Sequence, residues 1–172
     1  MASADLGELL HSFTDEAFRL ETLPRYTIEE EAEALQLFSE GKPMPMDFNK
    51  PWLEIVRGAA GTPRRFRRVR ILSDPITLYQ QFEIEWGYKN SSAAGEEIRL
   101  VGAEEAISLP SVDFWLFDDS TAVRMKYDSE GRFLGTVGVS DPAEIDSYRQ
   151  AKTRALELSS CLSEYLSTRR HS

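Results

Sequence analysis

The sequence predicts an α+β protein in which a mixed sheet is flanked by helices and followed by a long C-terminal helix. The 172 residues are enough for one domain of ordinary size, and 41% of them are hydrophobic. Residues 123–127 alternate between apolar and polar types, residues 128–131 are typical of a turn, and residues 132–139 can return as a second strand, so an antiparallel hairpin with one buried face is expected. Both ends of the chain show helical periodicity instead, so helices are expected around the sheet.

The first expected unit is an acidic helical arm over residues 1–41. Ten acidic residues and only two arginines lie in its first 40 residues, so they carry −8 of the formal net charge of −9. Apolar residues recur at helical spacing over residues 5–20, which predicts one helix there. Thr27 and Glu30 have the spacing of a capping box, which predicts the start of a second helix.

A proline-rich linker is expected over residues 42–51, and a mixed α/β body over residues 52–172. Pro51 favours the start of a short helix at Trp52. The rest of the body should contain strands, a helix, a polar loop and a hairpin, in the order strand 68–72, helix 74–86, loop 89–95, strands 97–101 and 112–118, and hairpin 123–139. A helix that begins at Pro142 should then continue without a break to Leu166.

The composition excludes several kinds of site. Cys161 is the only cysteine, which rules out a disulfide within the chain and a cysteine-based zinc site. His11 and His171 are the only histidines, so most histidine-based catalysis is excluded as well. The glycine-rich phosphate loops, the nucleophile elbow and the H-E-x-x-H pattern are missing. We therefore expect no cofactor, no metal and no catalytic residue.

The N-terminal residues and the apolar runs indicate a compartment. The first residues do not combine a basic stretch with an apolar core, as a signal peptide would. No apolar run approaches the roughly 20 residues that a membrane span needs. A cytoplasmic protein with no membrane partner is the expectation.

A run of five arginines in seven residues precedes the first strand of the body. Its members are Arg64, Arg65, Arg67, Arg68 and Arg70. Such a run is typical of a nucleic-acid or phosphate contact. Alternatively, the arginines pair within the chain with the acidic N-terminal segment, because opposite charges on one chain usually meet first.

A group of aromatic, acidic and polar residues predicts a ligand pocket. Its members are Glu83, Trp86, Tyr88, Asn90, Glu96, Arg99, Asp113, Trp115 and Asp118. The competing interpretation is an aromatic core with a terminal ion pair, such as Glu83 with Arg99. Asp118 and Asp119 could hold Mg²⁺ or act as an acid/base pair, but they are also ordinary turn residues.

Five segments of the sequence resemble a mostly actinobacterial family that is described as a domain of unknown function. They are Arg68–Leu72, Glu83–Tyr88, Gly95–Arg99, Asp113–Asp118 and Tyr127–Gly135. Members of that family are encoded near Xre-type helix-turn-helix regulators, so the resemblance implies a protein partner of that type. The element order of the body is also similar to one half of a phospholipase-D-like fold. The H-x-K-x-x-x-x-D motif of its catalytic members is missing, which implies an inactive version.

Three hypotheses follow, in this order. The first is a non-enzymatic interaction or ligand-sensing module in a transcription-regulatory system, with a helix-turn-helix protein as partner and a small-molecule ligand or a homodimer left open. The second is a carboxylate-based or metal-dependent hydrolase that uses Glu83, Glu96, Asp113 or Asp118, with Arg99 as an anion clamp. The third is direct nucleic-acid binding through Arg64 to Arg70, which a net charge of −9 does not favour for the chain as a whole.

Overall fold

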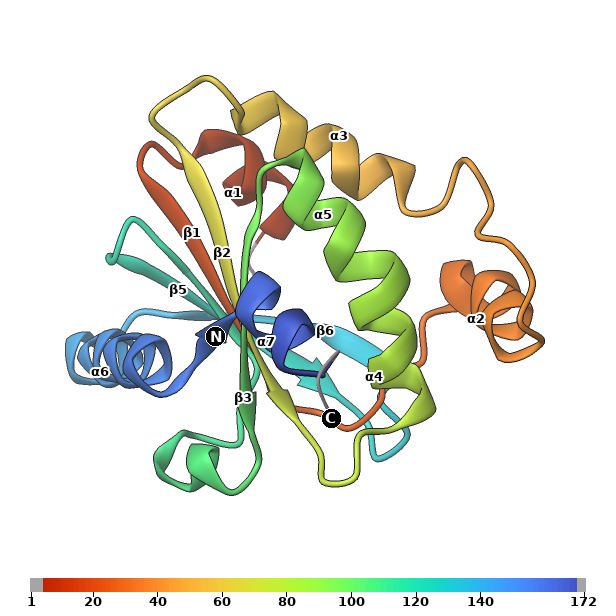
Figure 1. The fold of residues 1–172 in the computed structure, drawn as a ribbon. Coiled ribbons are helices and arrows are strands. Elements are labelled where there is room, and N and C mark those ends of the chain that lie inside the picture. Colours follow the sequence, from red (N-terminus) through yellow and green to blue (C-terminus); the bar gives the residue numbers. More distant parts are fainter. Residues whose placement is uncertain (1–4, 170–172) are drawn as a thin grey trace.

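Seven strands form one mixed sheet in a computed structural model of the protein, which describes residues 5–169 (Figure 1). The strand order is β6-β5-β4-β1-β2-β3-β7. The three parallel strands are β1 (Glu16–Glu21), β2 (Arg65–Leu72) and β3 (Glu97–Gly102). Four antiparallel strands complete the sheet: β4 (Phe114–Phe117), β5 (Thr121–Tyr127), β6 (Phe133–Val139) and β7 (Ser160–Cys161). The predicted mixed sheet of an α+β protein is confirmed. His171, one of the two histidines, lies outside the described residues.

Helices cover both faces of the sheet (Figure 1). The face that we call the cavity face is covered by α1 (Leu6–Ser12), which precedes β1, and by helices between the parallel strands. These are α3 (Lys50–Ala59), α4 (Leu78–Phe82), the π-helix η2 (Glu83–Tyr88) and α5 (Lys89–Ala94). The opposite face packs against α6 (Pro142–Leu158), a helix of 17 residues, and the short η3 (Glu105–Ser108). The remaining helices are η1 (Glu29–Glu31), α2 (Ala32–Ser39) and α7 (Leu162–Arg169).

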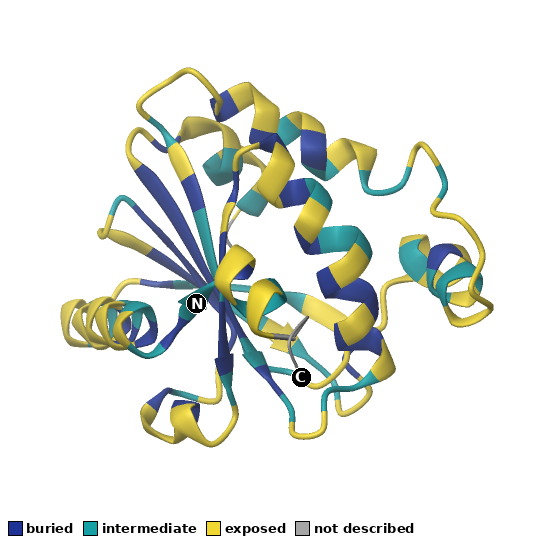
Figure 2. Ribbon diagram, viewed as in Figure 1, coloured by how far each residue is buried: buried dark blue, intermediate teal, exposed yellow. Residues whose placement is uncertain are grey.

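Alternation along the strands divides the core into two layers. Phe114 and Leu116 of β4 pack toward α6, while Trp115 and Phe117 pack in the cluster of the cavity face. Successive strand side chains point to opposite faces, which explains this division. Figure 2 shows the central strands as mostly buried, while the helices expose their outer sides.

The helix expected over residues 5–20 is wrong. α1 ends at Ser12, and the following residues form β1, which lies between β4 and β2 in the middle of the sheet. Residues 18–21 alternate between apolar and charged types as a strand does, but the charged residues are buried rather than exposed. Partners on other strands make that burial tolerable, and no local pattern reveals them. The segment assigned to an acidic arm therefore supplies a strand of the sheet.

The expected start of the second helix is also corrected. Thr27 forms no capping box, because its hydroxyl donates to the carbonyl of Glu130 instead. The helix itself is present as η1 and α2. Ile28, in an extended conformation, is the N-cap residue of η1, and its side chain does not cap this helix end.

The helix after β2 begins later and ends later than the sequence predicts. Thr77 caps it with Gln80 in a capping box, rather than Asp74 or Pro75. It does not stop at Gly87, because α4, η2 and α5 follow one another as far as Ala94. The predicted polar loop over residues 89–95 is therefore mostly helical.

The expected unbroken C-terminal helix is wrong as well. α6 ends at Leu158, and Ser160–Cys161 pair with β3 as β7 before α7 begins. Cys161 thus lies in a short strand and not within a helix. The hairpin of β5 and β6, the strands β2 and β3, and the helix that starts with Pro51 are confirmed.

Candidate functional site

A cavity of about 330 Å³ lies between the cavity face and the helices that cover it. Its floor is formed by residues of β1, β2 and β4, and its roof by α1, the start of α3, and η2. Six charged side chains line it: Arg19, Glu21, Glu31, Arg68, Glu83 and Glu96. Charged residues are almost never buried in proteins unless they are paired, so this density of charge needs an explanation.

Arg19 of β1 forms the first ion pair at the floor. Its terminal nitrogen lies 2.9 Å from Oδ2 of Asp113 and donates to the hydroxyl of Tyr127, also at 2.9 Å. Asp113 accepts further hydrogen bonds from the backbone and hydroxyl of Thr22 and from the hydroxyl of Tyr26. The Nε atom of Arg19 is buried and has no hydrogen-bond partner within the described part of the chain. One donor in the cavity wall is thus left unsatisfied.

Arg68 of β2 forms the second set of ion pairs. The parallel register places Arg68 beside Arg19. Its guanidinium lies between Glu21, at 3.0 Å, and Glu96, at 2.9 Å. It also lies over the rings of Trp52 and Trp115. Two adjacent guanidinium groups are therefore held in place by carboxylates from different elements.

The π-helix supplies the third group, which centres on Glu83. Arg70 of β2 is fully buried and donates to Oε1 of Glu83 through two nitrogens, at 2.9 and 2.7 Å. Oε2 of Glu83 lies 3.1 Å from the hydroxyl of Tyr88. In an α-helix residues five apart point about 140° away from each other. The wider π turn brings Glu83 and Tyr88 to one side, and such turns occur frequently at functional sites.

Burial and pairing move the pKa values of two carboxyl groups in opposite directions. Burial raises the pKa of Glu83 to about 7, although Arg70 opposes the change. Burial also acts on Glu21, but the guanidinium groups of Arg68 and Arg19 outweigh it and lower the pKa of Glu21 to about 2. At neutral pH Glu21 is therefore ionised, whereas Glu83 is partly protonated. Paired carboxyls with separated pKa values are a frequent feature of functional sites.

Five of the nine residues predicted for a ligand pocket meet at this site. Glu83, Tyr88, Glu96 and Trp115 line the cavity, and Asp113 lies behind it in contact with Arg19. The sequence groups them correctly, although they come from three separate segments. Whether they bind a ligand stays a prediction.

The other four predicted residues lie elsewhere. Trp86 packs against Phe38, and Asn90 donates to the carbonyl of Trp86 at 2.7 Å. Arg99 donates to Ser159 beside β7, so the expected ion pair with Glu83 is wrong. Side chains alternate along a strand, and Arg99 is one residue from the cavity-face positions Ile98 and Leu100.

Asp118 has a structural role at the start of β1. It accepts hydrogen bonds from the backbone N–H groups of Thr14, Asp15 and Glu16 at 2.7–2.9 Å. Slight desolvation is outweighed by these N–H groups, so the pKa of Asp118 lies below its ordinary value. Asp119 contacts Lys152 at 2.7 Å. Both carboxylates are therefore engaged within the protein.

The arginine run is divided between the two faces of β2. Arg68 and Arg70 point to the cavity face, while Arg65 and Arg67 both pair with Glu16 at 3.2 Å. The interpretation that the run pairs with the acidic N-terminal segment is confirmed for these contacts. Arg64 is exposed and lies over the ring of Phe13.

Sequence reasoning missed Arg19, Glu21 and Glu31 as part of the site. The first two belong to β1, whose residues were assigned to a helix. The signal that could have found them is the alternation of Arg19 and Glu21 with Phe18 and Leu20, which is typical of a strand.

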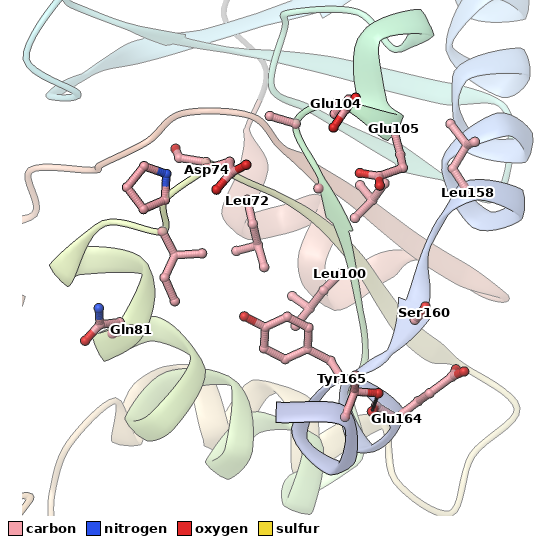
Figure 3. Close-up of a pocket in the computed structure, with 17 residues that line it drawn as sticks. Leu72, Asp74, Gln81, Leu100, Glu104, Glu105, Leu158, Ser160, Glu164 and Tyr165 are labelled. Atoms are coloured by element: carbon pink, nitrogen blue, oxygen red, sulfur yellow. Dashed lines mark hydrogen bonds between the residues drawn. The ribbon is translucent and has the colours of Figure 1, made fainter. Parts of the chain in front are cut away.

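A second concavity of about 840 Å³ opens at the carboxyl ends of β2 and β3 (Figure 3). Four carboxylates line it: Asp74, Glu104, Glu105 and Glu164. In Figure 3 the ring of Tyr165 lies near Leu100, between Glu164 and the other three acids. None of the described residues that line this acidic groove is basic. Ligands often bind at the carboxyl ends of parallel strands, but the groove holds no paired polar network like that of the cavity.

Neither concavity contains a group of three or more His, Cys, Asp or Glu side chains that could hold a metal ion, among residues 5–169. The acidic side chains of the cavity instead contact arginines and tyrosines. In Glu21, Glu83 and Glu96, hydrogen bonds and ion pairs involve both carboxylate oxygens.

Residues 4–167 match the family described as Domain of unknown function (DUF6879). The chain belongs to this family. The resemblance to a domain of unknown function is therefore confirmed, and the match includes every residue of the cavity in this DUF6879 protein. No curated protein matches the chain. Within the described residues, no helix of this DUF6879 chain is both long and apolar enough to cross a membrane.

Proposed function

We propose that this DUF6879 chain is a non-enzymatic module that binds a small ligand in the charged cavity. The observation that carries the proposal is the unpartnered Nε of Arg19, a residue of the cavity wall in which every other charged side chain except Glu31 forms an ion pair. A buried donor without a partner costs about 1–3 kcal/mol, and a ligand with a hydrogen-bond acceptor would remove that cost.

The size and the lining of the cavity support this proposal. Its volume of about 330 Å³ is at the lower end of the range for ligand pockets. Such pockets combine aromatic walls with a few fixed polar groups. Here Trp52 and Trp115 form aromatic walls, and ion pairs hold the neighbouring Arg68 in place.

The role in a regulatory system and the helix-turn-helix partner belong to the same proposal. They rest on the resemblance of the sequence to proteins encoded near such regulators. A ligand-dependent change of the helices over the cavity would be the means of signalling. Similarity of the body to an inactive phospholipase-D-like half is a finer proposal that rests on element order alone.

The experiment for ligand binding uses two matched glycine variants. Gly87 lines the cavity, and a Cβ added there would meet no atom within 4 Å, so Gly87→Leu places a side chain at the wall without a backbone clash. Gly58 is also helical and equally unobstructed, but it does not line the cavity. Gly58→Leu is therefore the control.

Thermal unfolding of the three proteins is followed across a set of small metabolites of differing charge. A ligand that binds only the folded state raises its unfolding temperature. We expect at least one compound to stabilise the parent and Gly58→Leu, but not Gly87→Leu. The proposal fails if no compound stabilises the parent, or if Gly87→Leu responds as the parent does.

A carboxylate-based hydrolase is the second candidate, and one observation favours it. Glu21 and Glu83 contact the same hydroxyl of Tyr88, and their pKa values are about 2 and about 7. A protonated and an ionised carboxyl side by side can act as general acid and base. Multiple turnover of a substrate that is lost in Glu83→Gln would favour this candidate over the first.

A further inference from the structure

The positive and negative charges of the side chains that line the cavity do not sum to zero. Two arginines and four glutamates line it, which leaves an excess of two negative charges when all are ionised. Arg70 and Asp113 lie directly behind the wall and contribute one charge of each sign, so they leave the excess unchanged. The cavity is therefore electronegative, even though it contains two guanidinium groups.

An excess of buried negative charge is costly in a medium of low polarity. It is relieved when a carboxyl group takes up a proton or when a cation binds. Burial raises the pKa of Glu31 and that of Glu83, which is the first form of relief. A bound cation would supply the second.

Glu31 is the carboxylate whose charge is least compensated. Oε1 of Glu31 accepts a hydrogen bond of 2.6 Å from the hydroxyl of Tyr79. It forms no ion pair with a basic side chain in the part of the chain that the structure describes, whereas Glu21, Glu83 and Glu96 each contact an arginine. The electrostatic attraction of a cation in the cavity should therefore be strongest beside Glu31.

Aromatic rings surround the same end of the cavity. Tyr26, Phe48, Tyr79 and Phe82 line it and belong to one cluster of side chains. The rings of Tyr26 and Tyr79 meet edge to face at 6.1 Å. Aromatic faces attract ammonium groups, and they also provide apolar contact for the rest of a ligand.

We infer that the ligand is a small organic cation, with an ammonium group beside Glu31 and an apolar body against the tyrosine and phenylalanine rings. This inference rests on the proposed function, because it names the ligand class of the same cavity. The acceptor that Arg19 Nε lacks would come from a polar atom elsewhere on the ligand. Acids of the same size are disfavoured by the excess negative charge.

The test uses three probes of nearly equal size that differ in charge: phenethylammonium, 2-phenylethanol and phenylacetate. Binding of each to the full chain is measured by calorimetry above neutral pH, because burial raises the pKa of Glu31 and of Glu83 and a higher pH favours their ionised forms. We expect phenethylammonium to bind at least about tenfold more tightly than either of the others, as a desolvated cation–aromatic and carboxylate contact would give.

Two glutamine variants then locate the cation. Glu31→Gln removes the charge at the cavity, while Glu33→Gln removes one from an exposed position of α2 that does not line it. We expect Glu31→Gln to weaken phenethylammonium binding about tenfold and to leave 2-phenylethanol binding unchanged. Glu33→Gln should bind both as the parent does.

The outcomes separate this inference from the proposed function. Tighter binding of phenylacetate, or amine binding that Glu31→Gln leaves intact, would overturn the cation assignment. If a neutral or acidic probe binds at least as tightly as phenethylammonium and Gly87→Leu abolishes that binding, the cation assignment fails, but the cavity is still a ligand site for another class. Amine binding that Gly87→Leu leaves intact would indicate the acidic groove instead, and it too would overturn the assignment. If none of the three probes binds, the cation assignment fails, and the metabolite set decides the proposed function.

Discussion

Glu21 of β1 and Glu83 of the π-helix share the hydroxyl group of Tyr88, which lies 2.7 Å from one carboxylate and 3.1 Å from the other. A hydroxyl has a single proton, so it cannot donate to two ionised carboxylates at once. The arrangement is satisfied when a protonated Glu83 donates to Tyr88, and Tyr88 donates to an ionised Glu21. The separated pKa values of the two carboxyls, about 7 and about 2, agree with this order of protons.

The first prediction concerns pH and stability. The pKa of Glu83 rises from its ordinary 4.5 to about 7 on folding. Between these values the folded state holds a proton that the unfolded state has lost, so the contribution of Glu83 falls as pH rises, and levels off above pH 7. The free energy of unfolding of the parent should therefore decrease over this pH range. In Glu83→Gln that decrease should be smaller by about 1–3 kcal/mol. Urea unfolding across the same pH range measures it, and equal slopes in parent and variant would contradict the prediction.

The second prediction concerns the buried pair of Arg70 and Glu83. Arg70→Met should lower the free energy of unfolding by about 3–5 kcal/mol, because it leaves Glu83 buried without its guanidinium. In the double variant Arg70→Met with Glu83→Gln, the carboxylate is gone and part of the loss should be recovered. Chemical denaturation of the four proteins gives the coupling energy. Strictly additive losses would mean that the pair is not coupled.

The third prediction separates structure from site at Asp118. Asp118→Ala removes the acceptor of three backbone N–H groups at the start of β1 and should cost about 1–3 kcal/mol. Asp118→Asn should cost less, because its amide oxygen still accepts and asparagine tolerates the φ of 54° found there. Thermal unfolding checks both. A variant that keeps full stability but loses ligand binding would instead place Asp118 in the site.

The elements that the sequence predicts well have a local cause. The hairpin of β5 and β6 has one alternating strand with a polar turn after it, and α3 begins with Pro51 at its first turn. β1 was missed because Phe13, Ala17 and Leu20 recur at helical spacing and continue the pattern of α1. The ion-pair partners of Arg19 and Glu21 lie on β2 and before β4, far away in the sequence, so only the folded sheet shows why they are buried.

The candidate site was predictable only in part, for the same reason. The sequence predicts Glu83, Glu96 and Asp113 as site residues because they are acidic residues that lie near aromatic residues along the chain. Their geometry depends on the π turn and on the parallel register that places Arg68 beside Arg19. Neither feature has a local sequence pattern, since Gly87 in the middle of the π-helix is more typical of a helix end.

The central claim is that the charged cavity holds a small organic cation, and a crystal structure of the protein with phenethylammonium tests it most directly. The account predicts the ammonium nitrogen within hydrogen-bond distance of the Glu31 carboxylate, with the ring of the probe against Tyr26 and Tyr79. A structure with the probe among Asp74, Glu104 and Glu105 of the acidic groove, and none in the cavity, would contradict it.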